Sequence, residues 1–238
     1  MTLRTPLRKA LADLGAVLGS EDGFDPHTGQ RTFQVALGDN ATTVVGLPLI
    51  ELLGSNAGPG VRITMSMAEP GAAAALLESG EIDLLIDAQR AIPENAKMRV
   101  LLTQPFVMAQ RKGHPRGTGT LDLETYLGLR HVVASPLRGP LHGYMDETLE
   151  QLGYRRNLVL SVPQFGMVPA VLDKSDYVSA LPAGLLAGYA DRLDMFALPF
   201  DAPLFALAMA WHPRNHKEPG LEWLRGLAAR AAGISVAA

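Results

Sequence analysis

Histidine and acidic side chains are the groups in this sequence most able to do chemistry, and their spacing decides whether they suit a metal site. His212 and His216 lie four residues apart, the spacing that places two imidazoles on one helix face. Pro213 lies between them and disfavours a helix there. We therefore expect no metal site at this pair.

The remaining candidates for catalysis are isolated in the sequence. His27, His114 and His131 have no chemical partner nearby, and we expect them at the surface or in loops. Asp83 and Asp87 flank an apolar segment, and two such carboxyl groups could act as a general acid and a general base. Capping and turn roles are commoner for such residues. No residue is marked out as a nucleophile.

Sequence motifs of catalysis and cofactor binding are also absent. The chain has no G-x-S-x-G elbow, no phosphate-binding G-x-x-x-x-G-K-[ST], no H-E-x-x-H and no complete G-x-G-x-x-G. It contains no cysteine, which excludes disulfides and thiolate metal ligands. We predict that the protein is not an enzyme and uses no cofactor or metal.

Polar and small residues instead gather where apolar strand-like segments give way to helix-like segments. Turns of this kind present backbone N–H groups and the positive end of a helix dipole, which suit an anion such as a carboxylate. Each turn alone is an ordinary connection with its caps. Several of them at one sheet edge are typical of a small-molecule pocket. The four turns are GDNATT (38–43), MAEPG (67–71), ASPLRGPLHG (134–143) and VPQFG (162–166).

The elements that carry these turns alternate between strands and helices. The first round predicts strands at 32–37, 61–67 and 82–87 and helices at 44–53 and 70–79. This β-α-β-α-β order predicts parallel pairing with right-handed crossovers. A second round predicts helices at 121–129, 141–152, 165–173, 182–190 and 218–233, with strands at 131–135, 157–162, 176–181, 195–200 and 204–212.

Two such rounds, joined by extended segments, predict two α/β subdomains and two crossing strands. We expect FVMAQRKG to cross outward and LFALAMAW to return. In open α/β sheets ligands bind beyond the carboxyl ends of strands, so the predicted ligand site is the cleft between the subdomains.

A leucine-rich helix precedes the α/β rounds. Residues 6–18 read as an amphipathic helix, and the stretch 20–30 reads as a hydrophilic linker. A helix that is separated by such a linker more often packs on a partner outside its domain, and we predict oligomerisation through Leu7, Leu11, Leu14 and Leu18.

Composition narrows the class of protein. The 238 residues carry a formal net charge of −3, which disfavours direct nucleic-acid binding. No apolar run has transmembrane length, and the N-terminus lacks a signal-peptide pattern. We expect a cytoplasmic protein that does not contact membranes.

Three ordered segments carry a family resemblance: RTFQVALGDNATTVVGLPLIELL, VRITMSMAEPGAAAALLESGEIDLLI and SVPQFGMVPAVLDKSDYVSALP. Together they resemble the effector-binding domain of LysR-type transcriptional regulators. FDPHTGQRTF (24–33) and AWHPRNHKEPGLEWLR (210–225) are similar to the branch with nodulation regulators and regulators of aromatic-compound catabolism. The resemblance covers nearly the whole chain.

The resemblance implies an α/β type 2 periplasmic-binding-protein fold: two Rossmann-like subdomains joined by two crossover strands, preceded by a short linker helix. It implies a partial linker helix and linker at 1–30, regulatory subdomain I at 31–108 with 205–238, and subdomain II at 109–204. It also implies a small-molecule effector, a homo-oligomer (dimer or tetramer), and DNA contact only through an N-terminal winged helix-turn-helix, which we expect to be absent from this chain.

Residues implied as effector contacts follow from the family's positions. Backbone N–H groups near Thr42 and Thr43 would hold the polar end of an effector, His142 and Gln164 would hydrogen-bond to it, and Phe165 would form an aromatic wall. The full set is Asn40, Ala41, Thr42, Thr43, Met67, Ala68, Glu69, Gly139, His142, Gln164 and Phe165.

Two other functions compete with this one. A solute-binding protein of a transport system would share the fold, but the missing signal peptide and the leucine-rich helix oppose it. An enzyme on the same fold would need a nucleophile or an acid–base pair in the cleft.

Overall fold

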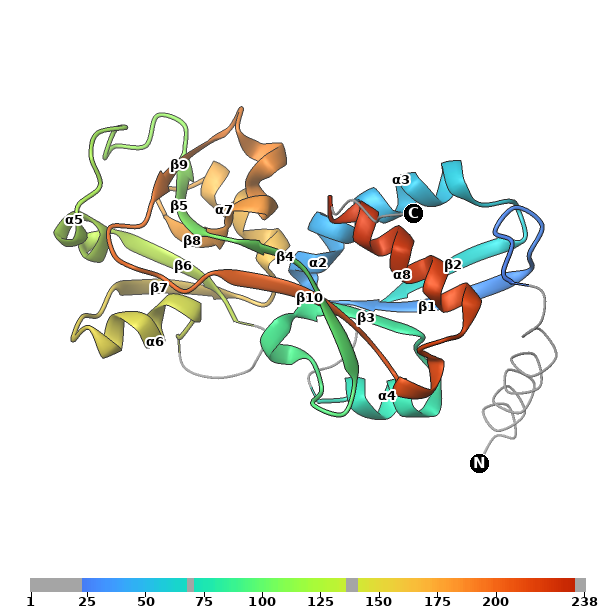
Figure 1. Ribbon diagram of the computed structural model, residues 1–238. Helices are drawn as coiled ribbons and strands as arrows, with labels where there is room; N and C mark the ends of the chain where they lie inside the picture. Colours follow the sequence, from blue (N-terminus) through green and yellow to red (C-terminus); the bar gives the residue numbers. More distant parts are fainter. Residues whose placement is uncertain (1–22, 68–70, 136–140, 234–238) are drawn as a thin grey trace. The chain divides into compact units, whose positions relative to one another are not determined.

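The chain folds into two compact units (Figure 1). The computed structural model describes residues 23–67, 71–135 and 141–233. Unit 1 comprises Met1–Leu102 and Ala206–Ala238, and unit 2 comprises Thr103–Phe205. The predicted helix at 6–18, with its four leucines, lies outside the described residues.

Unit 1 is built on a five-stranded sheet in the order β2-β1-β3-β10-β4. β1 pairs in parallel with both β2 and β3, as the alternation of strands and helices predicts, and β10 pairs antiparallel with β3. The strands are β1 (Arg31–Leu37), β2 (Val61–Ser66), β3 (Leu84–Ala88), β4 (Lys97–Gln104) and β10 (Phe205–Trp211).

Helices cover both faces of this sheet. Figure 1 shows α3 and α8 on one side of it and α4 on the other. α4 ends at Gly80, which has a left-handed φ of +74° that a side chain would strain. The elements of unit 1 outside the sheet are α2 (Asp39–Ala41), η1 (Thr42–Gly46), α3 (Leu47–Asn56), α4 (Ala73–Ser79), η2 (Gln89–Ala91), η5 (Pro213–Asn215) and α8 (Pro219–Ala231).

The beginning and end of the described chain pack together in unit 1. The ring of Phe24 lies 5.8 Å from that of Phe33 and 5.4 Å from that of Trp223, between centroids. Arg31 Nη1 lies 2.6 Å from Glu218 Oε1, and the Glu218 carboxylate also accepts two N–H groups at the start of α8. The segments 24–33 and 210–225 therefore meet in one packed region.

Unit 2 holds two small sheets. β5 is the centre of an antiparallel sheet with the order β8-β5-β9, and β6 and β7 form a parallel pair. The elements are β5 (Phe106–Arg111), α5 (Leu123–Gly128), β6 (Arg130–Ala134), α6 (Tyr144–Gln151), β7 (Asn157–Val162), η3 (Phe165–Met167), α7 (Val168–Asp173), β8 (Ser179–Pro182), η4 (Ala183–Tyr189) and β9 (Leu193–Ala197).

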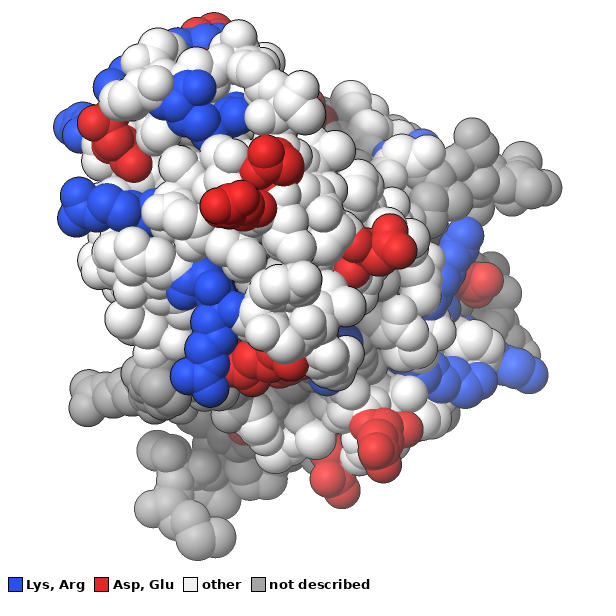
Figure 2. Space-filling model, turned by 90° about the vertical axis from the view of Figure 1, so that its left-hand side faces the viewer, with Lys and Arg blue, Asp and Glu red and all other residues white. Residues whose placement is uncertain are grey.

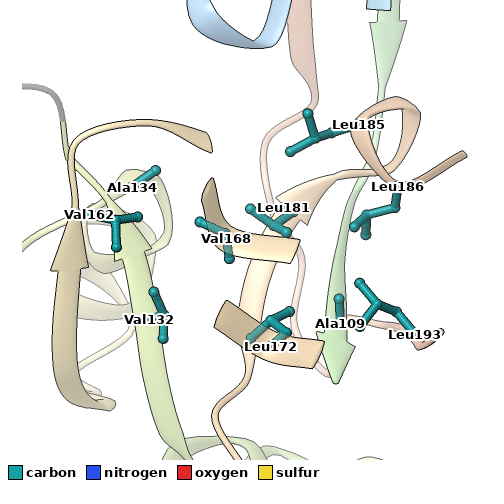
Figure 3. Close-up of a cluster of buried hydrophobic side chains, with 10 residues drawn as sticks. All are labelled: Ala109, Val132, Ala134, Val162, Val168, Leu172, Leu181, Leu185, Leu186 and Leu193. Carbon is teal, nitrogen blue, oxygen red and sulfur yellow. The ribbon is translucent and has the colours of Figure 1, made fainter. Parts of the chain in front are cut away.

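The core of unit 2 joins its two sheets. In Figure 3, Val168 and Leu172 of α7 lie between the side chains of β6 and β7 on one side and those of β5 and β8 on the other. Both residues are fully buried. Burial of an aliphatic side chain of this size contributes about 1.5–3 kcal/mol, so α7 stabilises unit 2 from its centre.

The helix expected at 182–190 is present as the 3₁₀ helix η4. One expectation about the elements needs correction. The chain passes from unit 1 to unit 2 within β4, after Leu102, and not in FVMAQRKG, which is β5. β4 and β5 are separated by Pro105, because proline cannot donate to a strand ladder.

Charged side chains of both signs are interspersed on the face shown in Figure 2, and large areas of it are uncharged. No helix among the described residues is long and apolar enough to cross a membrane.

Candidate functional site

The turn after β1 is helical from its second residue, which corrects the expected helix start at 44. α2 begins at Asp39 and runs directly into η1 and α3. The Thr42 N–H donates to the Gly38 carbonyl at 2.9 Å, and Thr42 Oγ1 bonds to the same oxygen at 3.1 Å. The Thr42 amide is therefore committed to this turn and is not free to bind a ligand, contrary to the expectation for the N–H groups near Thr42.

This helix contains a π-helical segment. Residues Thr42–Gly46 are π-helical, and the Leu47 N–H closes the segment by donating to the Thr42 carbonyl. Pro48 follows at the start of α3 and has no N–H, so the regular i→i−4 ladder is interrupted at this point. Single π turns of this kind are frequent at functional sites.

The predicted contacts on this turn differ in exposure. Asn40 is 4% exposed and Ala41 is fully buried, whereas Thr42 is exposed and Thr43 is half-buried. Both amide atoms of Asn40 lack a hydrogen-bond partner among the described residues. A buried amide without a partner is costly, so Asn40 is the strongest polar candidate for a ligand contact in unit 1.

The turn after β2 adds one described candidate. Met67 is 57% exposed, directly after β2. Ala68 and Glu69, predicted beside it, lie outside the described residues, as does Gly139 of the third turn.

Asp87 belongs to the same edge of unit 1 as Asn40, although its position in the sequence predicted only an acid–base, capping or turn role. It lies in β3 directly beside Gly38, whose N–H donates to the Ile86 carbonyl at 2.8 Å. Burial raises the pKa of the Asp87 carboxyl, the N–H of Ala88 lowers it, and the charge of Asp39 raises it. A parallel strand beside β1 places a carboxyl at this edge, a relationship that spacing alone does not reveal.

Asp83 has a different environment at the other end of β3. Its Oδ2 accepts the Gln34 N–H at 2.8 Å, and its Oδ1 lies 3.9 Å from Arg31 Nη2. Burial raises its pKa, against the opposing effects of that hydrogen bond and of Arg31. These contacts connect strands, so Asp83 and Asp87 do not form an acid–base pair.

In unit 2 the predicted residues line two different cavities. His142 lines an open cavity of about 410 Å³ beside α6, where its Nε2 lies 4.0 Å from Glu150 Oε2. Phe165 lines a much smaller one together with Gly143 and Tyr144. Within unit 2, therefore, His142 and Phe165 are not brought into one cavity. Gln164 precedes Phe165 at the start of η3.

Phe165 belongs to an aromatic cluster that the sequence argument missed. Its ring lies 6.1 Å from that of Tyr144 and 6.4 Å from that of Phe205, between centroids. Phe106 completes the cluster, 5.6 Å from Tyr144 and 5.7 Å from Phe205. Tyr144 begins α6 and Phe165 begins η3, the elements that follow β6 and β7 in the chain. The signal available in the sequence was an aromatic residue at the start of each helix.

A buried ionic network supports the start of α6. The Asp146 carboxylate accepts the Gly143 N–H at 2.6 Å and two hydrogen bonds from Arg156, at 2.8 and 2.7 Å. Arg156 Nη1 also donates to the Tyr126 hydroxyl at 3.2 Å. Although burial lowers the pKa of Arg156, its bonds to Asp146 and Tyr126 raise it overall, so the guanidinium stays charged.

The isolated histidines lie in different environments. His27 is exposed and His114 lies in a loop, as expected, although His114 is only 6% exposed. His131 is fully buried in β6, so its predicted surface or loop position is wrong. His131 Nε2 lies 2.7 Å from the Tyr126 carbonyl oxygen. Burial, together with the nearby Arg156 charge, lowers the pKa of His131 to about 4. The imidazole is therefore neutral at pH 7.

The C-terminal histidine pair has structural contacts. The His212 side chain accepts the Arg214 N–H at the start of η5, and the His216 ring stacks on Trp211 at 6.0 Å. Within the described ranges, no three His, Cys, Asp or Glu side chains are grouped as metal ligands.

Comparison with known proteins gives a consistent result. The family model described as "LysR substrate binding domain" matches residues 28–233. The chain is 29% identical to the HTH-type transcriptional activator NagR of a Ralstonia species and to NahR of Pseudomonas putida, in each case over 94% of this chain and 75% of the relative. It is 25% identical to a nodulation protein D 1 of a Bradyrhizobium species over 94% of this chain and 71% of the relative.

Solved structures show the same similarity. A probable transcriptional regulator from Pseudomonas aeruginosa matches with a TM-score of 0.82 and 28% identity, over 99% of this chain and 79% of that one. The regulatory domain of MexT, a transcriptional activator of the same organism, matches with a TM-score of 0.72 and 28% identity, over 84% of this chain and 99% of that one.

Proposed function

Because this chain belongs to the LysR substrate-binding domain family, the effector-binding part of non-enzymatic transcription regulators, we propose that it senses a small aromatic or other carboxylate. The observation that carries the proposal is the aromatic cluster of unit 2, with Tyr144 and Phe165 at the starts of α6 and η3. These two rings are half-buried, and an aromatic ligand packs well against such rings through its edge and face.

The polar end of the effector would be bound by the first turn of unit 1. Asn40 supplies a buried amide whose atoms have no partner among the described residues, and the Asn40 and Ala41 N–H groups belong to the first helical turn. Such groups favour an anion. In our proposal the same ligand is also bordered by Thr42, Thr43, Met67, Ala68, Glu69, Gly139 and Gln164, whereas His142 lies in the separate cavity beside α6.

Signal transmission would follow from ligand binding. We propose that unit 1 and unit 2 act as regulatory subdomains I and II, and that the effector stabilises one of two subunit arrangements of a cytoplasmic homo-oligomer. Leu7, Leu11, Leu14 and Leu18 would contribute to its assembly. A helix-turn-helix domain, the kind named in the HTH-type relatives, would pass the change to DNA.

A thermal-shift screen tests the proposal. The purified chain is heated with millimolar benzoates, phenylacetates and aliphatic carboxylates, and aromatic acids are expected to raise the melting temperature most. Saturation at about 100 times the Kd corresponds to about 2.7 kcal/mol of added stability. If no carboxylate raises the melting temperature, the proposed effector class is wrong. If only aliphatic acids raise it, the effector is a carboxylate but the proposed role of the aromatic cluster is wrong.

A further inference from the structure

Asp87 is a half-buried carboxyl flanked by small residues at the neighbouring strands. It lies between Gly38, which follows β1, and Ala208 of β10, with which it pairs directly. Neither neighbour has a side chain larger than a methyl group. A Cβ on Gly38 would overlap the Asp87 carboxyl, so glycine leaves the space that this carboxyl needs.

The carboxyl has an unused acceptor. Oδ1 accepts the Ala88 N–H at 2.7 Å, and no described residue donates to Oδ2. Asp83, in the same strand region, contrasts with it, because its two oxygens face the Gln34 N–H and Arg31. A half-buried carboxylate is stabilised by donors, so the open oxygen of Asp87 is suited to accept one more hydrogen bond.

A second polar group without a partner lies on the adjoining turn. Asn40 is 4% exposed, two residues after Gly38, and neither of its amide atoms bonds to a described residue. The Asn40 amide N–H₂ can donate a hydrogen bond to a ligand carboxylate, whereas the negatively charged Asp87 repels a ligand carboxylate. The edge therefore offers an amide for the anionic part of a ligand and an acceptor for a different, donating part.

We propose that Asp87 is a specificity-determining residue that accepts a hydrogen bond from a hydroxyl group of the effector, and so selects hydroxylated aromatic carboxylates over unsubstituted ones. The inference rests on the proposed function, since it assumes that an aromatic carboxylate binds at the turn after β1. It adds a requirement that the aromatic cluster and Asn40 do not impose, namely a donor on the ring.

Isothermal titration of the full chain with benzoate and its three hydroxy isomers tests the selection. At least one isomer is expected to bind wild-type protein about tenfold more tightly than benzoate, the gain typical of a hydrogen bond to a charged group. In Asp87→Ala, the preferred isomer should bind no more than about threefold more tightly than benzoate. Asp87→Asn keeps a carbonyl acceptor, and its preference should lie between those of wild type and Asp87→Ala. Asp83→Asn is the matched control and should keep the wild-type ratio.

The outcomes separate the two proposals. If benzoate binds and no hydroxy isomer is preferred, or if Asp87→Ala and Asp87→Asn both keep the preference, the role of Asp87 is wrong while the proposed function stands. If none of the four acids binds wild-type protein, the assignment of an aromatic carboxylate fails, and the role of Asp87 fails with it. The Asp87→Asn variant decides the matter should Asp87→Ala not fold.

Discussion

Arg156 binds Asp146 through two parallel hydrogen bonds, from Nε to Oδ1 at 2.8 Å and from Nη2 to Oδ2 at 2.7 Å, with both side chains almost fully buried. Asp146 also accepts the Gly143 N–H at the start of α6. One buried ion pair therefore holds the end of the turn that precedes this helix.

Removing the arginine should destabilise the protein strongly. Arg156→Met leaves the Asp146 carboxylate buried without its partner, and we expect a loss of about 3 kcal/mol or more in unfolding free energy. Urea denaturation measures it. Arg155→Met, at the exposed neighbouring position, should change stability by less than about 0.5 kcal/mol. Equal losses in both variants would contradict the role of the pair.

His131 should make stability depend on pH below neutrality. Its pKa is about 4 in the folded protein against an ordinary 6.5, so the unfolded chain binds the extra proton between these values. Stability is therefore fully present above about pH 6.5 and is lost as the pH falls towards 4, by up to about 1.4 kcal/mol per pH unit. Urea denaturation from pH 5 to 8 should show a shallower slope in His131→Gln than in wild type. A slope that the substitution leaves unchanged would assign the dependence to other groups.

Gly38 and Asp87 should be energetically coupled. Gly38→Ala places a methyl group against the Asp87 carboxyl and should cost about 1–3 kcal/mol. In an Asp87→Ala background the carboxyl is gone, and the same substitution should cost clearly less. The four proteins form a double-mutant cycle, measured by urea denaturation. Additive costs would show that the two residues do not constrain each other.

Asn40 should matter more for ligand than for folding. Because its amide has no partner among the described residues, Asn40→Ala should leave the unfolding free energy of the unliganded protein within about 1 kcal/mol of wild type. The melting-temperature rise caused by a bound carboxylate should fall or disappear. A large loss of stability without ligand would mean that the amide has a structural partner.

Phe165 should favour aromatic over saturated ligands. Phe165→Leu keeps an apolar side chain but removes one ring of the cluster, and should weaken benzoate about two- to tenfold relative to cyclohexanecarboxylate. Phe196→Leu is the control, since that ring packs under Arg116 in another part of unit 2. The ratio of the two affinities, from calorimetry, is the readout, and a ratio that changes equally in both variants would remove Phe165 from the site.

Much of the fold could be predicted because its elements have clear periods. The apolar runs at 32–37 and 61–67 and the helix-like segment between them predicted parallel strands, and β1 and β2 pair in that way. The helix start at Asp39 was missed, because GDNATT reads as polar turn residues although its chain is helical. The π-helical segment could not be predicted either, since only the structure shows that the helical hydrogen bonds change from i→i−4 to i→i−5 before Pro48.

The site was less predictable because its parts come from distant segments. Asn40 and Phe165 follow from turn positions, and whether they contact a ligand stays a prediction. Phe106, Tyr144 and Phe205 meet only because three separate elements fold together. The partner of Asp87 is a glycine almost fifty residues earlier, and His131 is buried by residues that no local pattern identifies.

The position of β10 has a consequence for how the chain is made. β10 lies between β3 and β4 in the sheet of unit 1, yet it follows the whole of unit 2 in the sequence. During synthesis, all residues of unit 2 are translated before the sheet of unit 1 can close. We therefore expect unit 2 to gain structure first on the ribosome. Until β10 is synthesised, about a hundred residues after β3, one edge of β3 stays unpaired.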